Sequence, residues 1–194
     1  MSILIGLTGP TGAGKSSLAP VAQKFGFKVV DCDVLARKAV LPNTPGFMAL
    51  KQVFGEKIVR ADGTLDRKAL AAEAFASAEK TELLNRTLLP HIAELVRSEL
   101  NAERVLLDAP TLFESGLDAL CDRTVAVLAD EQKRLCRIMQ RDGITNEEAK
   151  LRMNAGKPNA YYIERADHIL YNNDGPLAFE FEAAGLLKNI CGGK

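Results

Sequence analysis

The sequence has no net charge. Its 25 Lys and Arg residues are balanced by 25 Asp and Glu residues over 194 positions. A chain without a bulk positive field does not draw nucleic acid or an anionic membrane toward itself, so we expect neither as a partner. Any binding of phosphate must then come from local clusters of basic residues.

The sequence also lacks long apolar runs and cysteine patterns. No stretch approaches the ~20 consecutive apolar residues that cross a bilayer, and the N-terminus has no basic region leading into an apolar segment. The cysteines are scattered, without CxxC or Cys/His metal spacing, at Cys32, Cys121, Cys136 and Cys191. We therefore expect a cytoplasmic protein whose cysteines are reduced.

One segment, residues 9–16, matches the GxxxxGK[ST] phosphate-binding loop at every fixed position. An apolar run at 3–8 precedes it and a helical pattern follows, so strand, loop and helix come in the order that this loop requires. Its glycines allow backbone N–H groups to point inward around phosphates, at the positive end of the helix. The alternative is a glycine-rich turn that has these fixed positions by chance.

This loop predicts a nucleoside triphosphate site. Lys15 is expected to reach the β- and γ-phosphates, Ser16 to place its hydroxyl on Mg²⁺, and Ser17 to contact the α-phosphate. The nucleotide-binding residues expected in the loop are Gly9, Gly12, Ala13, Gly14, Lys15, Ser16 and Ser17.

A second strand is expected at 27–30, and it leads into Asp31-Cys32-Asp33. Side chains alternate along an extended segment, so Asp31 and Asp33 are expected to point together toward the phosphates. A carboxylate there can accept a proton from a substrate hydroxyl or bind Mg²⁺ through water. The alternative is that one of them caps the helix expected from Val34.

Residues 37–100 show helices and turns without a convincing central strand. We expect an inserted helical lobe, with a helix at 47–54, another at 67–77 capped by Asp66, and helices on either side of Pro90. Its apolar residues recur at helical spacing and favour a lobe core over a ligand site. Arg67 and Arg86 are its cations of interest, although an arginine on a helix surface is usually only solvated.

An apolar strand at 104–108 ends in Asp108, a second signature of a nucleotide site. A carboxylate at this point is predicted to hold Mg²⁺ from across the phosphate loop, together with Ser16. A further buried strand is expected at 124–128 and a last one at 166–171. The last strand leads into a turn at 172–175, which includes Asn173 and is expected to border the nucleotide base.

Arg134, Arg137 and Arg141 are spaced by three and four residues and therefore share one helix face. We expect at least one of them to contact phosphate and to help exclude water from the site. The alternative is an exposed basic face that pairs with Glu131 and Asp142.

Thr145 to Glu148 forms a capping box that starts another helix after Gly143. The two helices form a hairpin suited to closing as a lid. No repeat or low-complexity linker divides the chain, so we expect a single domain over 1–194. Its expected parts are a core of 1–36, 101–130 and 161–194, the helical lobe at 37–100 and the lid at 131–160.

These segments together resemble the dephospho-coenzyme A kinase family over nearly the whole chain. The phosphate loop alone is shared by a very large superfamily. More specific are the DxDxxAR segment at 31–37, directly after the second strand, and GxLDR at 63–67. Further matches are Leu84-Asn85, Pro110, Leu112-Phe113-Glu114, the Gln132/Arg134/Arg137/Arg141 pattern, Ala166-Asp167 and Asn173-Asp174-Gly175.

The resemblance implies an α/β P-loop NTPase/kinase fold, in which helices flank a parallel sheet. It also implies ATP-dependent phosphorylation of the ribose 3′-hydroxyl of dephospho-coenzyme A, the last step of coenzyme A synthesis. ATP and Mg²⁺ are the expected cofactors and dephospho-coenzyme A the expected partner, with the chain a monomer or weak homo-oligomer.

By the same resemblance, the expected catalytic residues are Asp33, Lys15 and Arg141, while Arg137 and Asn173 contact the nucleotide. The residues expected to bind the acceptor substrate are Asp33, Arg37, Arg67, Arg86 and Glu114.

The chain departs from the family pattern in three places. Pro10 and Thr11 replace the usual loop residues, Leu89 stands where His is usual, and Gly156 stands where Gln is usual. None of these changes removes Lys15, Ser16, Asp33 or Asp108, so the departures bear on substrate positioning and rate.

Other functions stay open at this point. A nucleoside or nucleotide kinase shares the loop and lid but not DxDxxAR with GxLDR. A nucleotide-dependent switch and a family member retained only for binding are further alternatives. Against a GTPase switch, the turn at 172–175 lacks the Lys of the guanine-reading [NT]KxD segment.

Overall fold

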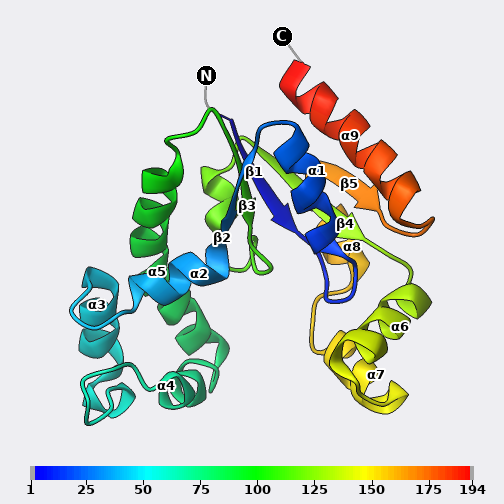
Figure 1. The fold of residues 1–194 in the computed structure, drawn as a ribbon. Coiled ribbons are helices and arrows are strands. Elements are labelled where there is room, and N and C mark those ends of the chain that lie inside the picture. The colour runs from blue at the N-terminus through cyan, green and yellow to red at the C-terminus, as the bar shows by residue number, and fades with distance from the viewer. Residues whose placement is uncertain (1–2, 193–194) are drawn as a thin grey trace.

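A computed structural model describes residues 3–192, and its centre is a five-stranded sheet (Figure 1). The strands run in the order β2-β3-β1-β4-β5, and every neighbouring pair is parallel. Their bounds are β1 Ile3–Thr8, β2 Lys28–Asp31, β3 Arg104–Asp108, β4 Arg123–Leu128 and β5 His168–Tyr171. The predicted strands are thus confirmed, with ends shifted by one or two residues.

The strands are apolar almost throughout because both faces of the sheet are covered. On one face, Ile5, Leu7 and Val125 pack with α1 (Leu18–Lys24) and α9 (Pro176–Gly192). On the other face, Leu4 and Val105 belong to a core shared with the helices of residues 32–99. The α/β fold with helices flanking a parallel sheet, predicted from the sequence, is confirmed.

Helices dominate residues 32–99, as predicted for the lobe. They are α2 Cys32–Ala39, α3 Pro45–Phe54, α4 Arg67–Ala74 and α5 Ala78–Glu99, with one 3-10 turn at Glu56–Ile58. An isolated bridge between Val59 and Leu65 is the only strand-like pairing among them in the described chain. Asp66 caps α4 as predicted, since its Oδ1 accepts from the N–H groups of Lys68 and Ala69.

The prediction of two helices around Pro90 is wrong. α5 continues through Pro90 as one helix of 22 residues. A proline inside a helix removes one backbone hydrogen bond, which commonly ends the helix. Here Ile92 and Val96 are buried in the core that the helices share with the sheet, and Ala93 is buried as well, so tertiary packing holds the helix together across the proline.

The hairpin after β4 consists of α6 (Glu131–Asp142) and α7 (Asn146–Asn154). Gly143 ends α6 with a φ of 64°, and the Thr145/Glu148 capping box starts α7, both as predicted. A short helix that was not predicted, α8 (Asn159–Ile163), leads back toward β5.

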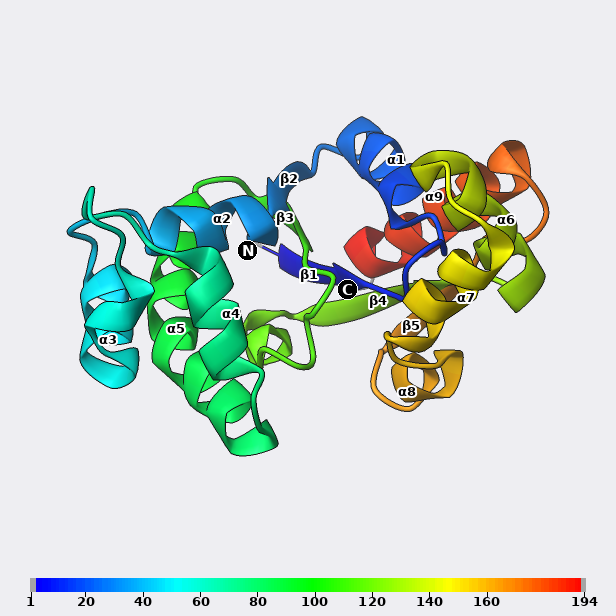
Figure 2. The same cartoon turned by 90° about the horizontal axis from the view of Figure 1, so that it is seen from below.

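Two helical parts project past the carboxyl ends of the strands. Figure 1 shows α3 and α4 on one side below the sheet and α6 and α7 on the other, and Figure 2 views the strand ends between them. Among residues 3–192, no helix combines the length and apolarity needed to cross a membrane.

Candidate active site

The glycine-rich loop after β1 makes a tight turn that only glycine accepts. Gly14 has a φ of 87°, and an added Cβ would lie 2.3 Å from Nδ2 of Asn172. Gly12 has a φ of 78°, and an added Cβ would lie 2.7 Å from the carbonyl oxygen of Arg134. Left-handed backbone and lack of space therefore both require glycine. The loop leads into the 3-10 turn Lys15–Ser17 and then α1, in the predicted order.

Lys15 lies over this loop and lines a cavity of about 810 Å³. Its ammonium group donates a hydrogen bond to the carbonyl oxygen of Gly9 at 2.8 Å. Burial lowers the pKa of Lys15, and the negative charges of Asp108 and Asp33 act in the opposite direction. Lys15 and Asp108 therefore line the same cavity at the edge of the sheet.

Asp108 ends β3 and also lines the cavity. One of its carboxylate oxygens, Oδ1, is buried without a hydrogen-bond partner in the described chain. Burial raises the pKa of Asp108, and the charge of Lys15 opposes that rise. A buried and unpaired oxygen of this kind normally requires a ligand.

Asp108 and Ser16 fit the requirements of Mg²⁺. Both line the cavity, and carboxylate and hydroxyl oxygens are the hard ligands that this ion prefers. Residues 3–192 contain no group of three or more acidic, His or Cys side chains that could hold a metal. Mg²⁺ commonly takes one or two protein ligands and completes its shell with water and phosphate oxygens, which matches this sparse set.

The expectation that Asp31 and Asp33 alternate along an extended segment is wrong. Asp31 is the last residue of β2 and caps α2, accepting from the N–H groups of Asp33 at 2.8 Å and Val34 at 3.2 Å. Asp33 already lies in the first turn of α2, because the helix begins at Cys32 rather than Val34. The carboxylate of Asp31 is therefore engaged in the helix cap. The side chain of Asp33 is not, and it remains exposed.

The three arginines of α6 lie on one face as predicted, but two of them hold the phosphate loop. Arg134 is 3% exposed, and its Nε donates to the carbonyl oxygen of Thr11 at 3.0 Å. Arg137 donates to the carbonyl oxygens of Ala13 at 3.1 Å and Asn172 at 2.8 Å. Because Arg134 is buried, the alternative of a fully exposed basic face does not hold.

Arg141 is the arginine of α6 that keeps most of its side chain in solvent, with 59% exposed. It lines the cavity and pairs with Asp142, as the exposed-face alternative predicted for that pair. Arg137 also lines the cavity.

Sequence reasoning missed residues of this cavity and of the phosphate loop beside it. Asn172 contacts the phosphate loop, with its Nδ2 donating to the carbonyl oxygen of Ala13 at 3.1 Å, and the predicted contact of Asn173 with the nucleotide stays a prediction. Asn173 is held by Asp130 outside the cavity lining. Arg152 and Lys157, beyond the predicted arginines, line the cavity as well. No local pattern distinguishes Asn172 from Asn173 at the end of a strand, and nothing near Arg152 marks it as different from a solvated arginine.

The basic side chains outnumber the acidic ones around this cavity. Its charged lining consists of Lys15, Arg137, Arg141, Arg152, Lys157, Asp108 and Glu114. A hollow of this size and charge suits a multiply phosphorylated small molecule. Of the predicted loop residues, Ala13 is buried and Ser17 is exposed, and neither side chain lines the cavity.

A second hollow of about 350 Å³ lies among the lobe helices. Three predicted substrate residues, Asp33, Arg37 and Arg67, line it beside apolar side chains that include Leu84 and Phe75. Arg86 is exposed and lines neither hollow. Glu114 lines the larger cavity instead, where its Oε2 is buried and unpaired among the described residues.

The parallel sheet, the glycine-rich loop and the buried carboxylate at the end of the adjacent strand define a nucleotide-binding protein of the P-loop kinase class. The model of the dephospho-CoA kinase family matches residues 3–177. A dephospho-CoA kinase of Corynebacterium glutamicum is 38% identical over 192 residues, which cover 96% of this chain and 96% of that protein. The chain therefore belongs to the dephospho-CoA kinase family.

Solved structures agree with this assignment. A protein of Thermus thermophilus is 34% identical, with a TM-score of 0.76 over 98% of this chain and 97% of its own. A dephospho-CoA kinase of Campylobacter jejuni is 25% identical, with a TM-score of 0.67 over 100% of this chain and 99% of its own.

Proposed function

We propose that this protein transfers the γ-phosphoryl group of ATP to the 3′-hydroxyl of the ribose of dephospho-coenzyme A, giving coenzyme A and ADP. Family membership supports this activity. The observation that carries it is the position of Asp33, which lines the lobe hollow and follows by two residues Asp31, the register partner of Asp108 in the larger cavity. One carboxylate thus lies between a phosphate site and a second binding hollow.

The donor nucleotide occupies the larger cavity. The N–H groups of the loop and Lys15 bind its β- and γ-phosphates, and Arg141 adds positive charge opposite them. Ser16 and Asp108 would hold Mg²⁺, which would supply positive charge beside the phosphates. Arg134 and Arg137 support this site by fixing the carbonyl groups of Thr11 and Ala13, so that the loop keeps its shape.

The acceptor occupies the hollow of the lobe. Arg37 and Arg67 provide positive charge for its diphosphate, and apolar side chains such as Leu70, Leu84 and Phe75 suit an apolar arm. Glu114 lines the larger cavity, and its unpaired Oε2 is a candidate hydrogen-bond acceptor for a hydroxyl of the acceptor ribose where that ribose enters this cavity to meet the γ-phosphate. Asp33 accepts the proton of the 3′-hydroxyl as that oxygen attacks the γ-phosphorus.

The roles of the lobe at 37–100 in acceptor binding and of the lid at 131–160 in excluding water are part of the same proposal. We also propose that the protein acts in the cytoplasm as a monomer or weak homo-oligomer. In the described chain all four cysteines are free, in keeping with a reducing compartment. Light scattering after size exclusion measures the assembly state.

Asp33→Asn tests the proton-accepting role, and Asp31→Asn is its matched control. Asn removes one negative charge in both variants, but it still caps a helix well at position 31. We expect Asp33→Asn to lower kcat by about 10²–10⁴-fold with little change in the Kd for MgATP, because general-base catalysis contributes this much. Asp31→Asn is expected to stay within about tenfold of the parent protein, since it removes a nearby charge and no proton acceptor.

The measurement is ADP release with and without dephospho-coenzyme A, followed by the mass of the product. Acceptor-dependent ADP release with a phosphate added to the acceptor supports the proposed reaction. ADP release without acceptor dependence, or without a phosphorylated product, would contradict it. Unchanged turnover of Asp33→Asn in an active preparation would remove only the role of Asp33.

A further inference from the structure

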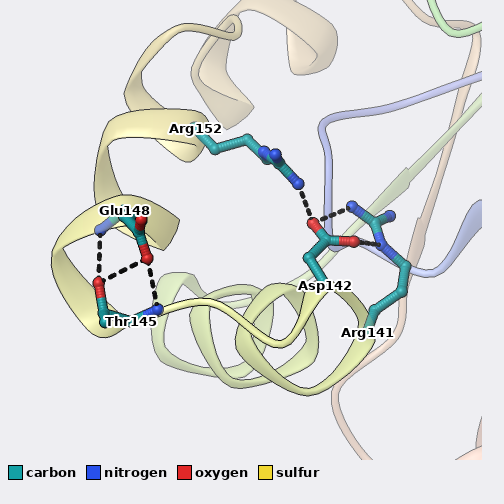
Figure 3. Close-up of polar contacts among 5 residues, drawn as sticks. All are labelled: Arg141, Asp142, Thr145, Glu148 and Arg152. Carbon is teal, nitrogen blue, oxygen red and sulfur yellow. Dashed lines mark hydrogen bonds and ion pairs between the residues drawn. The ribbon is translucent and has the colours of Figure 1, made fainter.

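A cluster of three charged side chains joins the end of α6 to α7. Figure 3 shows the carboxylate of Asp142 between the guanidinium groups of Arg141 and Arg152. Arg141 donates to it through two nitrogens, Nε to Oδ1 at 2.7 Å and NH2 to Oδ2 at 2.9 Å. Arg152 donates to the same Oδ2 from α7. Asp142 therefore holds two arginines from two helices at one place.

Both arginines line the larger cavity, whereas Asp142 does not. The side chain of Asp142 is 17% exposed, compared with 51% for Arg152. Arg152 makes no other side-chain hydrogen bond within residues 3–192, so most of its donors remain available to a ligand. The arrangement turns two cationic groups toward the cavity and keeps the carboxylate behind them.

Each guanidinium group would otherwise repel the other and move freely in solvent. A shared carboxylate removes part of that repulsion and fixes both planar groups before any ligand arrives, which lowers the entropic cost of binding. The hydrogen bonds from Arg141 and Arg152 hold the pKa of Asp142 at about 2, so the carboxylate stays ionised throughout the neutral range. The cluster is thus a permanent feature rather than a pH switch.

We propose that Arg152 is a second phosphate-binding residue of the hairpin and acts with Arg141 on the terminal phosphate of the nucleotide, while Asp142 is the positioning residue for both. This inference rests on the proposed function. The terminal phosphate is the appropriate target because Arg141 and Arg152 line the same cavity as Lys15, whose side chain serves that end of the triphosphate. Arg134 and Arg137, in contrast, are engaged with the carbonyl groups of the loop.

The other explanation is that the cluster only fastens α7 to α6. The same hairpin offers a control for that effect, because Thr145 and Glu148 form the capping box of α7 and neither lines the cavity (Figure 3). Thr145→Ala removes the cap and weakens the hairpin while leaving Arg141, Asp142 and Arg152 in place. A purely structural role for Arg152 would make its variants behave like Thr145→Ala.

Calorimetric titration with MgATP and MgADP distinguishes the two explanations. We expect Arg152→Met to weaken MgATP binding by about 10–100-fold and MgADP binding by less than threefold, because only ATP carries the terminal phosphate. Arg152→Lys keeps the charge but loses the planar pair of donors, and is expected to recover part of the loss. For Thr145→Ala, the ratio of the two affinities is expected to stay that of the parent protein.

Asp142→Asn gives a second readout. Without the negative carboxylate, the net positive charge that faces the nucleotide is larger. However, Arg141 and Arg152 are no longer held in a fixed orientation. We therefore expect kcat to fall about tenfold while the KM for ATP does not rise. If the cluster had a merely structural role, the kcat of Asp142→Asn and the kcat of Thr145→Ala would each stay within about twofold of the parent protein.

The outcomes separate this inference from the proposed function. If the parent protein binds neither MgATP nor MgADP, the proposed function fails, and the inference fails with it. If the parent protein is an active kinase but Arg152→Met keeps its ratio of ATP to ADP affinity, the inference alone is wrong. An equal loss of affinity for both nucleotides would also overturn it, because contact would then not be with the terminal phosphate.

Discussion

At the scale of single residues, three carboxylates at the ends of β2 and β3 have different surroundings. The sheet register places Asp31 beside Asp108, and Asp33 follows in the first turn of α2. Asp31 and Asp33 are both exposed, but one oxygen of Asp31 accepts the N–H groups of the helix cap. Asp108 is partly buried and has an unpaired oxygen. Environment rather than residue type therefore suggests separate roles for the three: cap, metal ligand and proton acceptor.

The burial of the Asp108 carboxylate is expected to lower the free energy of unfolding at neutral pH. Its pKa is raised in the folded protein, so the folded state holds this proton more tightly than the unfolded state. Stability contributed by this group is therefore present at low pH and is lost as pH rises from the unfolded pKa through the raised folded pKa. We expect Asp108→Asn to unfold at a higher urea concentration than the parent protein at pH 7, because it removes the buried charge.

Urea titrations at pH 7 and near pH 4 provide the measurement for Asp108→Asn. The gain relative to the parent protein is expected to shrink at the lower pH, where Asp108 becomes protonated in the folded state. The same variant is expected to lose activity, since Mg²⁺ loses a ligand. If Asp108→Asn were less stable than the parent protein at pH 7, the expectation that the buried charge of Asp108 destabilises the fold would be wrong.

At the scale of elements, α5 is the clearest case of packing that overrides local preference. Pro90 lies inside it and is exposed, so the residue gives up a backbone hydrogen bond without burying its ring. The buried residues that follow, including Ile92 and Val96, keep the helix continuous. The cost of the proline is thus offset by contacts with α2 and α3.

Pro90→Ala is expected to stabilise the protein. Alanine restores an N–H donor for the carbonyl group of Arg86 and is favoured over proline in a helix interior by up to ~3 kcal/mol. We expect a net gain of about 1–2 kcal/mol in the free energy of unfolding, measured by urea titration, because the greater flexibility of the unfolded chain with alanine offsets part of the gain in the helix. Thr87→Ala is a suitable neighbouring control, and a loss of stability in Pro90→Ala would mean that the lobe requires the proline.

Two sets of interactions hold α7 in the hairpin, and they lie at different ends of the helix. The capping box starts the helix locally, whereas Asp142 ties its Arg152 back to α6 through a contact ten residues away in sequence. Arg134 and Arg137 anchor the root of α6 to the phosphate loop. Any closing motion is therefore expected in the distal part of the hairpin rather than at its root.

At the scale of the whole molecule, ligand binding is expected to stabilise the fold. MgATP at 100 times its Kd would raise the free energy of unfolding by about 2.7 kcal/mol, since it binds only the folded protein. The shift is expected to shrink when Mg²⁺ is chelated and to be nearly absent in Lys15→Met. Thermal unfolding with matched nucleotide concentrations measures it, and a full shift in Lys15→Met would contradict the role of Lys15.

Much of this molecule follows from the sequence because the governing interactions are local. The glycines of the phosphate loop, the cap at Asp66 and the capping box at Thr145 each act within a few residues. The apolar strands follow from their burial on both faces of a parallel sheet. The order of strand, loop and helix therefore indicated the class of site before any contact was known.

Tertiary structure decided the rest, because those choices depend on distant partners. The burial of Ile92 and Val96 kept α5 intact across Pro90, and the hydrogen bond from Asn172 to the carbonyl oxygen of Ala13 joins the end of β5 to the phosphate loop. Arg152 lines the cavity while it donates to Asp142 on another helix, a contact that no local sequence pattern indicates. The sequence by itself determined the loop, the strands and the caps, whereas packing and long-range hydrogen bonds decided which polar side chains meet at the site.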